Sequence, residues 1–77
     1  MHPHPTRLKG ASGHIYRTIQ AMLAHGNAEF SYLDLAVESD YSLPAVIESV
    51  RRLEALGLLV VERRGPGRPN RYQFPVL

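Results

Sequence analysis

An arginine-rich segment near the C-terminus has the clearest chemical character in this sequence. Residues 63–71, called here the arginine segment, contain Arg63, Arg64, Arg68 and Arg71 among glycines and prolines. A guanidinium group presents several N–H donors in one plane, which suits phosphate oxygens and guanine edges. Four such charges in nine residues repel one another unless an anion meets them. The segment therefore indicates binding of a nucleic acid.

The tip of the arginine segment has a backbone suited to a narrow groove. Gly67-Arg68-Pro69 holds one arginine in an extended, slim stretch of chain, a shape that can enter a DNA minor groove and sense its width. A purely structural hairpin would more often use a two-residue turn such as Asn-Gly. The alternative interpretation is a solvated, flexible loop. We expect Arg68 to contact the minor groove.

Charge is distributed unevenly along the chain, although the net charge is only +2. Residues 26–50 contain five acidic and no basic residues, whereas residues 51–77 contain six arginines and two glutamates. This predicts a basic face at the C-terminal end, as in nucleic-acid-binding proteins. The acidic stretch from Glu29 to Glu48 leaves open a second interpretation, in which it docks a protein partner.

Three helices are predicted to position these charges. Apolar residues recur every three or four positions from about Ser12, a candidate N-cap, to His25. Ser31 and Asp34 resemble a capping box for a short helix from Tyr32 to about Glu38. Asp40 marks a turn, since Asp tolerates the left-handed conformation.

The third predicted helix covers residues 43–56. Ser42 is its N-cap, Pro44 lies in its first turn and Gly57 ends it. Val46, Val50 and Leu53 share one apolar face. The opposite face carries Pro44, Glu48, Arg51, Arg52 and Ala55, with Ile47 at its border.

After Gly57 the sequence pattern changes from a helical period to one typical of strands. Residues 58–63 and 71–74 have the composition of two short strands, joined by the arginine segment. Tyr72 and Phe74 are expected to pack onto the core. The sequence thus predicts an α+β fold, with residues 1–13 as a flexible arm and residues 14–77 as one domain.

From Ile15 to Phe74 the chain resembles the winged helix-turn-helix superfamily of bacterial and archaeal regulators. The resemblance rests on Ser31 to Ala36, on Ser42 to Val46, and on the passage from Val50 to Leu59. The run from Gly67 to Tyr72 is similar to the wing tip and return strand of such regulators. The resemblance implies three helices followed by a two-stranded β-hairpin wing.

The resemblance also implies a DNA-binding surface formed by the third helix and the wing. Its residues would be Ser42, Leu43, Pro44, Ala45, Ile47, Glu48, Arg51, Arg52, Arg63, Arg64, Arg68, Asn70 and Arg71. Two features depart from the usual pattern. Glu48 is acidic where many members carry a basic or amide residue, and Leu43, Ala45 and Ile47 are apolar. These apolar side chains could touch thymine methyl groups, and Glu48 could accept from a cytosine amine or remain a solvated charge.

We therefore expect sequence-dependent binding of double-stranded DNA by a small transcriptional regulator, acting as a repressor and as a homodimer. The alternatives are an accessory protein of a plasmid or phage, acting in replication, partition or excision, and a protein-docking winged helix. Nothing resembles a nucleophile–base pair, so we expect no enzyme.

Further expectations concern ligands and location. His2 and His4 have a chelating spacing but no further ligands nearby, so we expect no metal and no cofactor. A chain this short leaves little room for an effector pocket, so we expect no small-molecule effector. Cysteine is absent, no apolar run reaches the length of a membrane span, and no signal peptide is apparent. We expect a cytoplasmic protein, associated with the nucleoid when bound to DNA.

Overall fold

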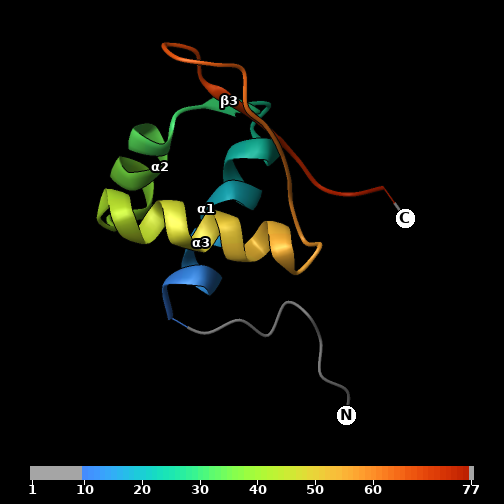
Figure 1. Cartoon of the computed structure of the whole chain (residues 1–77). Coiled ribbons are helices and arrows are strands. Elements are labelled where there is room, and N and C mark those ends of the chain that lie inside the picture. Colours follow the sequence, from blue (N-terminus) through green and yellow to red (C-terminus); the bar gives the residue numbers. More distant parts are fainter. Residues whose placement is uncertain (1–9, 77) are drawn as a thin grey trace.

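The structure is a computed structural model that describes residues 10–76. In this part of the chain the elements are α1 (Gly10–Ala24), β1 (Glu29–Phe30), α2 (Tyr32–Ser39), α3 (Leu43–Ala55), β2 (Val60–Glu62) and β3 (Asn70–Gln73). Figure 1 shows α3 lying across α1, with the β2–β3 connection projecting beyond the helices at one end. No helix among these residues is both long and apolar enough to cross a lipid bilayer.

The sheet has three antiparallel strands in the order β1-β3-β2. Because the sequence predicted only a two-stranded hairpin, β1 is an addition. Glu29 pairs with Arg71 and Phe30 with Asn70, so the segment before α2 supplies hydrogen bonds to the free edge of β3. A two-residue strand has no periodicity from which it could be predicted. The α+β architecture remains compatible with a winged helix.

The helix boundaries follow local capping chemistry. The Ser31 hydroxyl accepts from the Asp34 backbone N–H at 2.9 Å, and the Asp34 carboxylate accepts from the Ser31 N–H at 3.0 Å. This confirms the predicted capping box at the start of α2. Asp40 ends α2 in the left-handed conformation with φ 63°, as expected. Ser42 caps α3 through the Ala45 N–H.

The end of α3 requires a glycine. Gly57 has φ +75°. Its N–H donates to the Glu54 carbonyl at 2.9 Å, and the Leu58 N–H donates to the Leu53 carbonyl at 3.0 Å. This pair of bonds is a Schellman motif, which reverses the chain and directs it into β2.

The prediction for the start of α1 was wrong. The helix begins at Gly10, so Ser12 lies inside it and is not the N-cap, and residues 10–13 belong to the helix instead of a flexible arm. Gly13 is buried, which the sequence pattern did not indicate. The remaining arm, residues 1–9 with His2 and His4, lies outside the described residues.

One core joins the helices to the sheet. Ile15 and Ile19 of α1 and the predicted inner face of α3 are completely buried. The Phe30 and Tyr72 rings stack with their centroids 4.2 Å apart and an interplanar angle of 5°. Phe74 meets Tyr16 edge-on at 5.7 Å. Both aromatic residues of the last strand region therefore pack on the body of the protein, as predicted.

Candidate nucleic-acid interface

The outer face of α3 carries most of the helical residues predicted to contact DNA. Leu43, Pro44, Glu48, Arg51 and Arg52 are exposed, whereas Ala45 and Ile47 are half-buried at the margin of this face. The division arises because Val46, Val50 and Leu53 occupy the opposite side of the helix and are completely buried. The Ser42 hydroxyl is exposed but is already engaged in the cap of α3.

Arg63, at the base of the arginine segment, is held by the body of the protein. Its Nη1 and Nη2 atoms donate to the two Glu54 carboxylate oxygens at 3.0 and 2.7 Å. Nη2 also donates to the Tyr32 hydroxyl at 2.9 Å. The side chain thus joins α2, α3 and the exit from β2.

The contact between Arg63 and Glu54 stabilises the charged form of both side chains. Hydrogen bonds from Arg63 hold the pKa of the Glu54 carboxyl below its usual value, against the opposing effect of partial burial. The positive charge of Arg51 acts in the same direction, which links the outer face of α3 to the base of the arginine segment. The hydrogen bonds that Arg63 donates to Glu54 raise the pKa of the guanidinium. Arg63 is therefore a cation at any pH at which the protein is folded.

Glu29 on β1 neutralises part of the remaining basic charge. One of its carboxylate oxygens lies 3.1 Å from Nη1 of Arg64 and 4.0 Å from Nη1 of Arg71. Arg64 is the more enclosed of the two arginines, with 24% of its side chain exposed against 55% for Arg71. Glu29 and Arg71 are also cross-strand partners in the β1–β3 register. Arg71 is consequently the freer of the two to meet an external anion.

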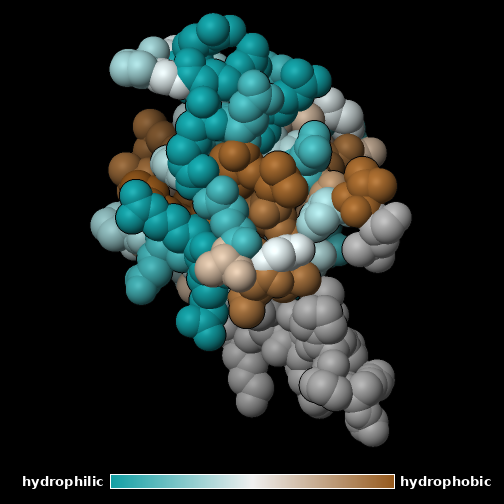
Figure 2. Space-filling model, turned by 45° about the vertical axis from the view of Figure 1, so that its right-hand side comes forward, coloured by the Kyte–Doolittle hydropathy of each residue, from teal (hydrophilic) through white to brown (hydrophobic). Residues whose placement is uncertain are grey.

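Arg68 occupies the tip of the arginine segment. Its N–H donates to the Gly65 carbonyl at 3.2 Å, which closes the turn. Gly65 and Gly67 have φ values of +98° and +77°, a region that other residues rarely adopt. Arg68 is exposed and makes no ion pair within residues 10–76, and the same holds for Arg51 and Arg52. Hydrophilic residues cover the upper end of the face in Figure 2, where Figure 1 places this projecting segment.

Asn70, the remaining predicted contact, is half-buried and partly engaged. Its Nδ2 donates to the Tyr72 hydroxyl at 3.2 Å. Burial raises the pKa of Tyr72 to about 12. The phenol therefore stays neutral at physiological pH, and its stack on Phe30 fixes the start of β3 beneath the arginine segment.

Three partners of the arginines were not predicted from the sequence: Tyr32, Glu54 and Glu29. Arg63 is 31 residues from Tyr32 and nine from Glu54. Neither separation belongs to a helical or strand period. The contact of Glu29 with Arg71 follows from their cross-strand pairing, which depends on a strand, β1, that is too short to be predicted from the sequence.

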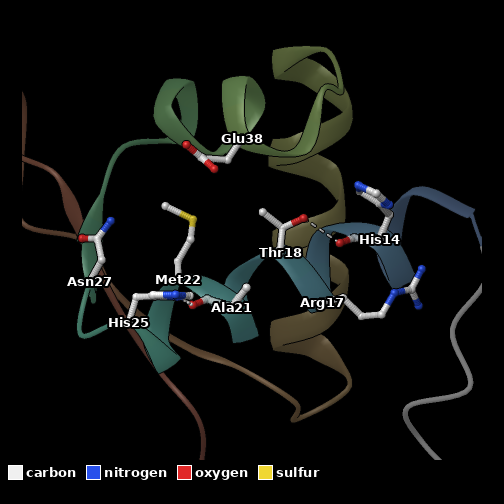
Figure 3. Close-up of a pocket in the computed structure, with 8 residues that line it drawn as sticks. All are labelled: His14, Arg17, Thr18, Ala21, Met22, His25, Asn27 and Glu38. Atoms are coloured by element: carbon white, nitrogen blue, oxygen red, sulfur yellow. Dashed lines mark hydrogen bonds between the residues drawn. The ribbon is translucent and has the colours of Figure 1, made fainter.

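A separate groove of about 510 Å³ lies between α1 and α2. Figure 3 shows Met22 of α1 pointing towards Glu38 of α2, with His14 and His25 at opposite ends of the groove. The Nδ1 atom of His25 is 2.8 Å from the Ala21 carbonyl of its own helix. Residues 10–76 contain no group of three or more acidic, histidine or cysteine side chains that could hold a metal ion. The predictions of no metal, no cofactor and no effector stay predictions.

Comparison of the chain with protein-family models, with curated proteins and with solved structures gave no match.

Proposed function

We propose that this protein binds double-stranded DNA and acts as a small transcriptional regulator of the repressor type. The third helix, α3, would lie in the major groove, and the arginine segment would contact the flanking backbone and the adjacent minor groove. The observation that carries the proposal is that Arg51 and Arg52 on α3 and Arg68 at the projecting tip are exposed and make no ion pair within residues 10–76.

The dimensions of α3 suit this role. Its 13 residues correspond to about 20 Å of helix, and the major groove is about 12 Å wide. The face opposite the core is exposed along its length. Phosphates attract the arginines irrespective of base sequence, and this attraction supplies much of the affinity of such proteins.

Of the arginines on α3 and in the arginine segment, four contact DNA in this proposal and two do not. Arg68 enters the minor groove and neutralises a phosphate beside it. Arg52 and Arg71 contact phosphates, and Arg51 faces the base edges of the major groove. Arg63 holds the segment in place through Glu54 and Tyr32, so it is not assigned a phosphate. Arg64 is shielded by Glu29 in the free protein.

Homodimer formation is part of the proposal, since one small module makes few base contacts. Two linked modules reading two half-sites gain affinity without new contacts. Sedimentation of the protein with and without a duplex measures the number of copies bound.

The experiment is a titration of a labelled duplex, taken from the DNA upstream of the protein's own gene, against a scrambled duplex of equal composition. Fluorescence anisotropy at several salt concentrations gives the slope of log K against log salt. Each phosphate contact contributes about −0.9 to this slope. We expect binding that falls steeply with salt and is tighter on the upstream duplex.

Arg17→Ala is the matched control for Arg52→Ala and Arg68→Ala. Arg17 is an exposed arginine that lines the α1–α2 groove, so its removal changes net charge equally but away from the proposed interface. The Arg52 and Arg68 variants should each reduce the slope by about 1, whereas the Arg17 variant should not. Absence of binding at low salt, or an equal loss in all three variants, would overturn the proposal.

A further inference from the structure

The outer face of α3 is chemically unusual for a surface that meets DNA. It contains a hollow of about 520 Å³ lined by Leu43, Pro44, Ile47, Glu48 and Arg51. Three of the five side chains are apolar, one is acidic and only one is basic. A face that bound phosphates alone would gain nothing from four of these residues. If α3 lies in the major groove as proposed, these side chains meet the edges of the bases.

The apolar part of the hollow matches the thymine methyl group. Leu43 is 40% exposed, and Ile47 lies one helical turn further along the same side of α3. In the major groove, the C5-methyl of thymine is the one apolar group that a base pair presents. Burying it against Leu43 and Ile47 removes apolar surface of both molecules from water, which is favourable.

The exposed carboxylate of Glu48 indicates a second base that α3 would contact. It makes no ion pair within residues 10–76, so it would approach DNA as a free anion, repelled by the phosphates. A carboxylate needs a donor that has no acceptor beside it. The adenine N6 amine has the N7 acceptor next to it, whereas the cytosine N4 amine has only a C–H neighbour on its own base. Cytosine therefore compensates Glu48 best.

Arg51 follows Glu48 by three residues and so lies on the same side of the helix. A guanidinium pairs with the O6 and N7 atoms of guanine. We infer that α3 reads thymine next to a C·G pair, with Leu43 and Ile47 on the methyl group, Glu48 on the cytosine amine and Arg51 on guanine. This inference rests on the proposed function and specifies the sequence that it recognises.

The test begins with selection of bound duplexes from a randomised pool at about 0.15 M salt, the ionic strength of the cell. The selected site should contain thymine beside C·G. Replacing its thymines by deoxyuridine removes only the methyl groups. We expect each important methyl to contribute about fourfold to affinity, the factor that corresponds to one buried carbon. Leu43→Ala and Ile47→Ala should bind the thymine and deoxyuridine duplexes equally.

Glu48→Ala is the most informative variant, because it should increase the affinity for non-specific DNA and decrease the preference for C·G. The variant should bind non-specific duplexes more tightly, because repulsion from phosphates is removed. At the same time it should lose the preference for C·G at the contacted position, which we expect to be roughly tenfold or more in the original protein. Leu33→Ala, which removes an exposed leucine from α2, is the matched control and should retain all discrimination.

The outcomes separate this inference from the proposed function. Equal binding of thymine and deoxyuridine duplexes by the unmodified protein, or an unchanged C·G preference in Glu48→Ala, would overturn the inference while leaving salt-dependent DNA binding intact. Absence of any duplex binding at low salt would overturn the proposed function itself. Melting temperatures of all variants establish that each is folded.

Discussion

The base and the tip of the arginine segment both contain arginines, but within residues 10–76 those at the base are paired with other side chains and the one at the tip is not. At the base, Arg63 makes three hydrogen bonds to Glu54 and Tyr32, and Arg64 lies 3.1 Å from Glu29. At the tip, Arg68 follows Gly65 and Gly67, which have positive φ; it is exposed and has no ion pair within residues 10–76. The comparison shows that an arginine-rich loop is not a uniform basic patch. The inner arginines orient the loop, and the outer one is left available.

This division has a physical reason. An arginine near the body of a small protein finds carboxylates that belong to other elements, and bidentate pairing to a carboxylate suits its planar donors. A residue at the tip of a projecting loop lies beyond their reach. Binding to an anion then costs Arg68 no internal ion pair, whereas it would cost Arg63 its partners.

The largest effect on DNA binding is expected from reversing the charge at the tip. Arg68→Ala should weaken duplex binding about fivefold at 0.15 M salt, the factor implied by the loss of one phosphate contact. Arg68→Glu should weaken it more than tenfold, since repulsion is added. Anisotropy titrations give both values. An unchanged melting temperature is the control, and equal affinities of the two variants would contradict a direct contact with DNA.

Removing a negative charge near the base of the arginine segment is expected to increase the affinity for DNA. Glu29→Gln removes the carboxylate that neutralises Arg64 and Arg71, so two guanidinium groups become available to phosphates. Affinity should rise about three- to fivefold, with a steeper salt dependence. Glu38→Gln removes the same charge from the α1–α2 groove and should change the affinity less. An equal gain in both variants would show that only net charge matters.

Removing the Arg63 side chain should affect the stability of the fold more than the binding of DNA. Arg63→Ala removes an ion pair whose two side chains are 44% and 27% exposed. Solvent screens such a pair, so we expect a loss of about 0.5–1 kcal/mol in the free energy of unfolding. Urea denaturation measures this loss, and Arg63→Lys should recover only part of it. The slope of DNA binding with salt should remain unchanged, and a reduced slope would place Arg63 among the phosphate contacts.

The smallest effect concerns pH. Because Arg63 lowers the pKa of Glu54 in the folded protein, the pair stabilises the fold above the ordinary carboxyl pKa of 4.5. This contribution is lost as pH falls from that value through the lowered pKa of the folded state. Glu54→Gln should therefore lose less stability than the unmodified protein between about pH 5 and pH 3. Identical acid dependence of the two proteins would show that the pair contributes nothing to stability.

The sequence by itself determined those features that depend on near neighbours in the chain. The capping box of Ser31 and Asp34, the left-handed Asp40 and the Ser42 cap are interactions over four residues or fewer. The inner face of α3 follows from the helical period, because Val46, Val50 and Leu53 recur on one side. Such features depend only on local geometry, so the order of the residues is sufficient to predict them.

Tertiary structure decided which arginines are free. The short strand β1 has no period of its own and exists because the β3 edge offers hydrogen bonds. That pairing places Glu29 beside Arg64 and Arg71, and the packing of α2 on α3 places Tyr32 and Glu54 beside Arg63. Attraction between charges depends on distance in space and not on separation along the chain. The sequence therefore showed that the segment is basic, and only the fold distinguished the arginines that lie beside carboxylates from Arg68, which makes no ion pair within residues 10–76.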